Sequence, residues 1–443
     1  MRTRARFGGT VGLAGLLALL PFAGAAQETD PSAPEARLTI GQQIAVEDGN
    51  LIGITPVDVI LRTGTRVQTL QFSLSAPFRL NDPEEDKTFA LGDPQARLLF
   101  RRGARNSAIE AELGYRESDL DEEILFDDIS NEFVTLYEGR VAQTDARLTY
   151  VFGREAKLGG EFGLFWLKRD YSGTADPDLD DNQTLSGNIA FYLEPTPLIR
   201  ARILAEASRT DGEIDDSRTS RYGAGASLQV DKLTNLDVEL ARTQIRRDDD
   251  GEREEAEGPS LRLNLTRSRP LGDWSLSFGS EPGTKGRRAD FNIGRTLQLR
   301  GYDLSGQIGV THFQDNYDPV FQIAYRQQIT RLSEIQASLR RAGATDDDGD
   351  EALNTEVTAN YSRQLSDVSS IAANIRYRES EVQSGDSEDA RTVSFGIDYN
   401  RALPNDFSLV AGASVIRSKN SSGIRDDEER VYVGVNRSFS FMP

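Results

Sequence analysis

The last stretch of the chain alternates strictly between apolar and polar residues. Val431, Val433 and Val435 share one parity with Phe439 and Phe441, and the residues between them are mostly polar or small. A period of two residues is typical of a β-strand with one apolar and one polar face. Arg437 is the exception on the apolar parity. The pattern predicts a strand that runs almost to the end of the chain.

The same alternation recurs along most of the sequence. It is clear in five further segments, which are 109–116, 261–266, 321–326, 371–380 and 392–400. Each has aliphatic or aromatic residues on one parity and Arg, Asn, Ser, Glu or Gly on the other. One such segment is weak evidence, but a succession of them predicts an all-β protein made of antiparallel strands.

Two kinds of connection separate these strands. Short turn sequences rich in Gly, Pro, Asn and Asp recur every ~30–40 residues, which fits pairs of ~10-residue membrane strands with their loop. They lie near residues 64–65, 103–104, 154–155, 194–197, 233–235, 270–273, 300–301, 332–334, 366–367 and 403–405. Between them we predict longer acidic loops at 176–182, 211–218, 248–258, 345–351, 383–389 and 420–429. The count gives roughly 18–22 strands in an even-numbered barrel.

The N-terminus predicts export. Arg2, Arg4 and Arg6 precede the apolar run 11–22, and small residues follow at 23–26, as in a cleaved secretory signal peptide. The apolar run is too short to span ~30 Å of hydrocarbon as a helix. We therefore predict a signal peptide at 1–26, a flexible lead-in at 27–36 and a barrel at 37–443. This short lead-in argues against a large N-terminal plug domain.

Composition agrees with a membrane barrel. Only 37% of the 443 residues are hydrophobic, the formal net charge is −20 and there is no cysteine. A soluble core of this size normally contains more apolar residues. A transmembrane barrel needs only a thin apolar band facing lipid, and its interior stays polar. Cysteine is absent, so no disulfide framework is possible.

The terminal strand resembles that of Gram-negative outer-membrane β-barrels, in which a final aromatic residue is recognised by the barrel assembly machinery. The resemblance extends to barrel porins over essentially the whole mature chain. It implies that Phe439 and Phe441 form the assembly signal. It also implies a single antiparallel up-and-down transmembrane barrel, with short periplasmic turns and longer extracellular loops. The resemblance further implies that the barrel contacts outer-membrane lipid and lipopolysaccharide.

The polar parity carries charges that we predict to line a lumen. They are Arg97, Arg101, Arg147, Arg200, Arg202, Arg262, Arg326, Arg340, Arg376, Arg378, Glu110, Glu112, Glu161, Glu206, Glu356 and Asp398. Opposite charges on facing walls would create a transverse field that filters solutes. The alternative is that neighbouring charges simply pair. Residues 118–131 are the best candidate for a constriction loop.

Other chemistries find little support in the sequence. The acidic runs 345–350 and 248–251 do not fit the calcium-loop register, and solvated loops with diffuse divalent-ion bridging to lipopolysaccharide explain them better. The one histidine, His312, lies on the apolar parity near a strand end, with no serine–histidine arrangement around it. We predict no enzyme activity, no cofactor or metal, and no nucleic-acid partner, because the chain is strongly acidic.

The sequence thus favours an outer-membrane, porin-like channel for passive diffusion of small hydrophilic solutes, and it leaves open whether the barrel forms a homo-oligomer. Three other interpretations stay open. A non-conducting structural or adhesive barrel would act through its acidic surface loops, a ligand-specific transporter would carry an inward plug or constriction, and a soluble β-protein would bury its apolar faces in a core.

Overall fold

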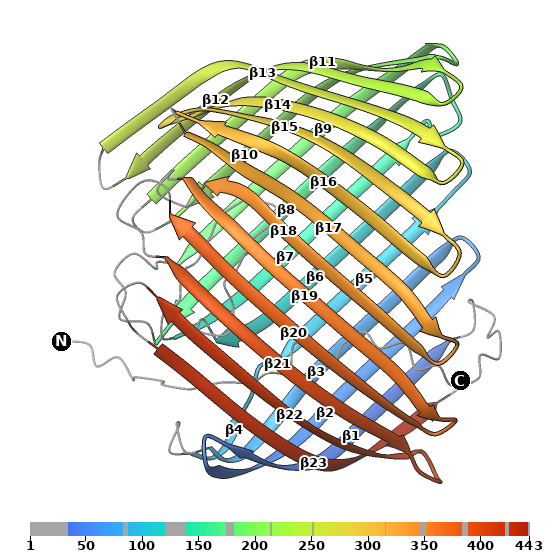
Figure 1. The fold of residues 1–443 in the computed structure, drawn as a ribbon, viewed down its shortest axis with the longest axis vertical. Helices are drawn as coiled ribbons and strands as arrows, with labels where there is room; N and C mark the ends of the chain where they lie inside the picture. Colours follow the sequence, from blue (N-terminus) through green and yellow to red (C-terminus); the bar gives the residue numbers. More distant parts are fainter. Residues whose placement is uncertain are drawn as a thin grey trace.

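The computed structural model is a closed antiparallel β-barrel (Figure 1). It describes residues 34–82, 87–119, 139–173, 181–212, 215–249, 252–314, 316–345, 351–382, 389–420 and 425–441. The signal peptide, most of the lead-in and residues 120–131 of the suggested constriction loop lie outside these ranges. Among the described residues, no helix is long and apolar enough to cross a membrane.

Twenty-three strands form one sheet. They are β1 Glu35–Glu47, β2 Asn50–Thr65, β3 Gln68–Asp82, β4 Lys87–Leu91, β5 Gln95–Gly103, β6 Ser107–Asp119, β7 Arg140–Phe152, β8 Leu158–Ser172, β9 Asn182–Thr196, β10 Ile199–Asp211, β11 Asp215–Asp231, β12 Thr234–Asp249, β13 Glu252–Arg269, β14 Gly272–Gly283, β15 Gly286–Leu299, β16 Tyr302–Phe313, β17 Asn316–Thr330, β18 Ser333–Thr345, β19 Glu351–Ser366, β20 Ser369–Val382, β21 Ala390–Ala402, β22 Phe407–Asn420 and β23 Arg425–Phe441. Both β4 and β5 pair with β3, end to end, so the wall has 22 strands, the top of the predicted range.

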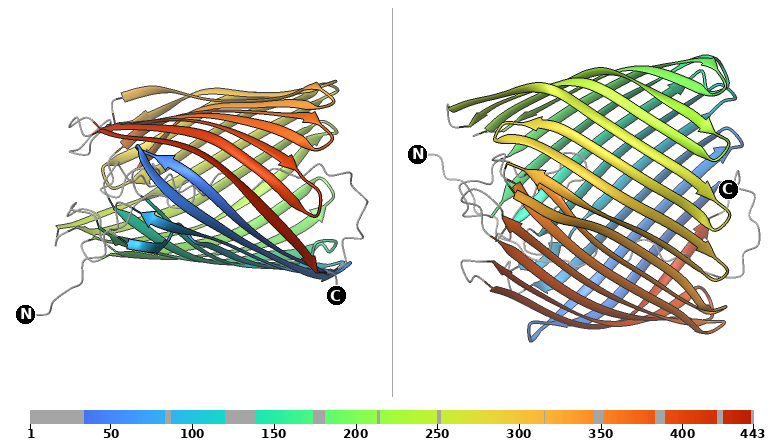
Figure 2. Two further views of the ribbon diagram at one scale, coloured as in Figure 1. Left: turned by 90° about the horizontal axis from the view of Figure 1, so that it is seen from below. Right: turned by 45° about the horizontal axis from the view of Figure 1, so that its top comes forward.

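The first and last strands close the barrel. β23 pairs antiparallel with β1 from Ala36 opposite Phe441 to Glu47 opposite Arg430. Every other wall strand pairs with its neighbours in sequence, which is the predicted up-and-down topology (Figures 1 and 2). β1 begins at Glu35, so the last residues of the predicted lead-in belong to the wall.

Each strand turns one parity outward and the other inward. Residues directly opposite in antiparallel strands share a face, so the pairing register extends each parity from strand to strand. On one face, large apolar side chains such as Ile203 and Ile308 are 61% and 67% exposed. On the other face, Arg221 and Glu239 are 5% and 7% exposed. The crowded polar face is the concave inside, and the exposed apolar face is the outside.

Arg437, the exception in the terminal pattern, is explained by its neighbours. Its guanidinium lies over the rings of Phe407 and Phe439, 5.0 and 4.7 Å from their centroids. Arg295 lies over Trp274 in the same way, at 4.5 Å. Cation–π contact lets a charged side chain share the apolar parity near the end of a strand.

The turns were predicted well, and the acidic loops were predicted too long. The ten connections at the turn end, which joins β2 to β3, comprise two to five residues each, at the predicted places. At the opposite loop end, however, residues 215–218, 252–258 and 425–429 continue as strand. Most strands have 12 to 18 residues, more than the ~10 that cross a membrane. Backbone pairing continues beyond the apolar band, so polarity alone misplaced the strand ends.

Candidate functional site: the charged inner face

All sixteen charges predicted for the lumen lie on the inward parity. Most of them pair with an opposite charge on an adjacent strand. Arg97 contacts Glu112 at 2.6 Å and Arg101 contacts Glu110 at 2.9 Å, each from β5 to β6. Arg378 and Arg376 approach Glu356 to 3.3 and 4.0 Å. Opposite charges therefore alternate round the wall, as the pairing alternative predicted, and do not separate onto facing walls.

The remaining predicted charges have several kinds of neighbour. Arg147 lies over the Phe165 ring at 5.3 Å, and Arg200 lies over Tyr192 at 4.1 Å while its guanidinium also pairs with Glu194 on β9 at 3.5 Å. Asp398 accepts a 2.5 Å hydrogen bond from the Tyr432 hydroxyl, across Gly412 of the intervening strand β22. By register, Arg340 stands opposite Glu356, and Glu161 stands opposite Ala190.

The densest group is a charge network across β10 to β14. Arg202 binds Asp237 through two bonds of 2.7 Å and reaches Glu239 at 2.7 Å. Arg221 bridges Glu206, at 3.0 Å, and Glu239. Arg262 pairs with Glu281 on β14, at 2.5 Å.

A glycine makes this network possible. Gly225 on β11 stands between Arg202 and Glu239, so the Arg202 side chain crosses β11 to reach β12. A Cβ at this position would lie 2.9 Å from Arg202 Cζ and 2.7 Å from the Val238 carbonyl oxygen. The sequence analysis found Arg202, Arg262 and Glu206 but missed Arg221, Asp237, Glu239 and Glu281. Extending the same parity through β11, β12 and β14 identifies these four.

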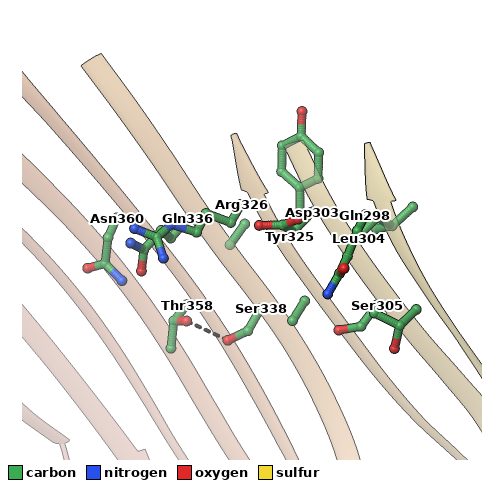
Figure 3. A pocket seen from close by; sticks show the side chains of 13 residues that line it. Gln298, Asp303, Leu304, Ser305, Tyr325, Arg326, Gln336, Ser338, Thr358 and Asn360 are labelled. Carbon is green, nitrogen blue, oxygen red and sulfur yellow. Dashed lines mark hydrogen bonds between the residues drawn. The ribbon is translucent and has the colours of Figure 1, made fainter. Parts of the chain in front are cut away.

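A polar hollow of about 290 Å³ lies on the inner wall of β15 to β19. Figure 3 shows two rows of side chains crossing the strands there. Gln298, Asp303, Arg326, Gln336 and Asn360 form the first row, each opposite the next. In the second row, Ser338 and Thr358 share a 2.6 Å hydrogen bond. Hydroxyls and amides both donate and accept hydrogen bonds, and Asp303 and Arg326 add one charge of each sign to the lining.

The inner face differs between its two ends. Toward the loop end, inward residues such as Ala352, Ser380 and Thr392 are only 1–6% exposed. Toward the turn end, the side chains of Arg101 and Arg326 are 58% and 61% exposed. The inner face is therefore closely packed near the loops and open to water near the turns.

Within the described ranges, the groups to consider for metal or serine–histidine chemistry are the acidic residues and the one histidine. No group of three or more His, Asp or Glu residues in the described ranges could hold a metal ion. His312 lies on the outward parity, opposite Tyr317, with ring centroids 4.3 Å apart. This is the place on the apolar parity, near the end of a strand, that the sequence predicted for it.

No family model and no curated protein matches this chain. Its fold is similar to the FrpB iron transporter from Neisseria meningitidis, with 10% identity, coverage of 92% of this chain and 82% of that chain, and a TM-score of 0.60. It is also similar to the ferric-catecholate import receptor Fiu from E. coli K12, at 10% identity, 91% and 81% coverage, and a TM-score of 0.59. The siderophore receptor PiuA from Acinetobacter baumannii is similar at 9% identity, with coverage of 92% of this chain and 82% of that chain and a TM-score of 0.58.

These neighbours are an iron transporter, a ferric-catecholate import receptor and a siderophore receptor. At such low identity, the similarity establishes the fold alone. The predicted outer-membrane barrel fold is confirmed, and the solved barrels it resembles are receptors and transporters rather than simple porins.

Proposed function

We propose that this protein is an outer-membrane channel through which small hydrophilic solutes diffuse. The observation that carries the proposal is the largely polar inner face of a closed 22-strand wall, with hydroxyl and amide rows beside paired charges. Paired charges cancel at short range, so the channel would select weakly between cations and anions. The predicted signal peptide and the terminal Phe439 and Phe441 support export and assembly into the outer membrane.

The loop-side half would limit the flux. Its inner residues are closely packed, whereas the turn-side half is open to water. A solute would therefore cross a wide turn-side vestibule and a narrower loop-side passage. Conductance should be small for a barrel of this circumference.

Single-channel recording tests the proposal. The purified mature protein in a planar lipid bilayer should give discrete, long-lived current steps, with a small reversal potential in a salt gradient. A folded, heat-modifiable barrel that carries no current would contradict the channel. The adhesive or structural alternative, acting through acidic surface segments, would then be preferred.

Cysteine labelling locates the pathway, because the chain has no cysteine of its own. Asn360 lines the inner hollow, and Ile323 lies outside, 39% exposed. A charged methanethiosulfonate should reduce the current through Asn360→Cys and leave Ile323→Cys unchanged. Equal effects at both positions would contradict an inner route.

A second candidate is a substrate-specific uptake receptor. Its support is the similarity of the whole wall to the iron transporter and the ferric-catecholate receptor. Calorimetry with a ferric catecholate separates the two functions. Saturable binding would favour the receptor, and solute flux that rises linearly with concentration would favour the channel.

A further inference from the structure

Three arginines stand side by side on the outer face of β10, β11 and β12. Arg209 is directly opposite Arg218, and Arg218 is directly opposite Arg246. All three are exposed. These strands adjoin one another at the top of Figure 1. We call Arg209, Arg218 and Arg246 the arginine row.

A second row of opposite sign lies one outward position closer to the loop end. Asp211 is opposite Asp216, and Asp216 is opposite Asp248. On β13 both rows change sign, because Glu255 faces Arg246 and Arg253 faces Asp248. The outer wall of β10 to β12 thus carries a positive layer and, beyond it, a negative layer.

On β10 the arginine row borders the apolar band, whereas on β12 Gln244 and the Arg242–Glu257 pair continue the polar zone below it. Below it the outward positions of β10 are Ile199, Ala201, Ile203, Ala205 and Ala207. Ten residues separate the start of β10 from Arg209, about the length of a membrane-crossing strand. The arginine row therefore lies at headgroup depth in the loop-side leaflet.

Like charges directly opposite in a sheet repel each other, so the row needs anions to stabilise it. Asp211 pairs with Arg209 at 2.5 Å, and Glu255 approaches Arg246 at 3.5 Å. Both acids stand at the margins of the row. Within the described residues, the structure shows no ion pair for the central Arg218.

We propose that the arginine row binds the phosphate of an anionic glycolipid in the loop-side leaflet, with an acyl chain against the outward residues of β10 and β11. Guanidinium groups bind phosphate through paired hydrogen bonds. Ala205 and Ala207 on β10 are small outward residues, and the exposed ring of Tyr222 beside them on β11 adds an apolar surface against which a chain can lie. The acidic row repels anions that approach from the loop-side solution, so a phosphate anchored in the membrane is favoured over a soluble one.

The proposal concerns the outer face and does not depend on conduction. The test measures binding of a diphosphorylated glucosamine lipid to detergent-purified full-length protein by native mass spectrometry. Each arginine near an anionic lipid surface contributes about fivefold in affinity. Arg218→Gln should therefore weaken binding about fivefold, and the triple change R209Q, R218Q, R246Q about a hundredfold.

Arg105→Gln is the matched control, because this exposed arginine, paired with Glu155, lies at the turn end. It should bind the lipid as the unmodified protein does. The dephosphorylated lipid should lose affinity to the same extent as the triple variant. Unchanged binding by a triple variant that still shows heat-modifiable folding would overturn the proposal. Displacement of the lipid by millimolar inorganic phosphate would also overturn it, by showing a site for free anions.

Discussion

Two parts of the barrel wall are built differently. From β10 to β13 each strand pairs with the next over nearly its full length, and the charge network lies on a complete ladder. From β1 to β6 the ladder is interrupted. Pro56 on β2 stands directly opposite Pro77 on β3, and the β1–β2 register skips Gly41 and Gln42 beside Pro56.

The interrupted wall continues where β4 ends and β5 begins. Gly92, Asp93 and Pro94 separate the two strands, and single backbone bonds join Gly92 to Pro77 and Glu117 to Pro94. Proline has no N–H to donate, so a row of prolines removes backbone bonds from neighbouring strands.

Buried ion pairs lie close to this interrupted wall, and Asp93 itself stands in the gap between β4 and β5. Arg79 pairs with Glu47, and their side chains are 5% and 10% exposed. Arg140 pairs with Asp93, at 12% and 2% exposure. In the complete wall, by contrast, Glu239 contacts two arginines, Arg202 and Arg221, and each of them also contacts a second carboxylate. Side-chain pairing therefore bridges the break in the ladder at Asp93, and it supplements a complete ladder between β10 and β13.

The largest effect should come from Asp93→Asn. It removes the nearly fully buried carboxylate beside the Arg140 guanidinium, which keeps the partly exposed Glu117 at 3.3 Å, so we expect a loss of about 3 kcal/mol in the free energy of unfolding. The midpoint of heat modifiability in detergent measures it. Changing Arg140→Met as well should restore part of the loss, and the exposed pair variant Arg105→Gln should leave the midpoint unchanged.

Glu239→Gln should lower the free energy of unfolding by less, about 2 kcal/mol. It weakens the hydrogen bonds between Glu239 and its two arginines, but each arginine retains another carboxylate. Arg202 keeps Asp237, and Arg221 keeps Glu206. The same unfolding midpoint reports it. A loss larger than that of Asp93→Asn would reverse the proposed contrast between the two walls.

Gly225→Ala should destabilise the complete wall by about 1 kcal/mol, since the new Cβ meets the Val238 carbonyl and Arg202. Gly103→Ala is the control, because a Cβ there meets nothing within 4 Å. If both variants unfold at the same temperature, the passage of Arg202 across β11 is not sterically constrained.

The smallest expected effect is on hydrogen exchange of backbone amides, which reports local opening of the sheet. Backbone amides at Gly41 and Gln42 should exchange with deuterium faster than those at Gly223 and Ala224, because fewer ladder bonds protect them. Pro56→Val should slow the exchange at residues 41 and 42. Mass-spectrometric hydrogen exchange in detergent measures both. Equal protection in the two walls would contradict the interruption.

The sequence by itself determined the strands, their faces and most turns. Alternation in 261–266 or 392–400 specifies which side chains point inward, because the side-chain period of a strand is two. All sixteen predicted inner charges follow from that parity. The terminal alternation also identified the strand that closes the barrel on β1.

Only the tertiary structure decided which charges meet and where strands end. The partner of Arg202 lies two strands away, and that distance depends on register and on Gly225, which periodicity does not contain. Strands extend through the acidic segments 215–218 and 252–258 because a neighbour pairs with them there. The arginine row and the proline interruption likewise arise from the register that aligns residues of neighbouring strands.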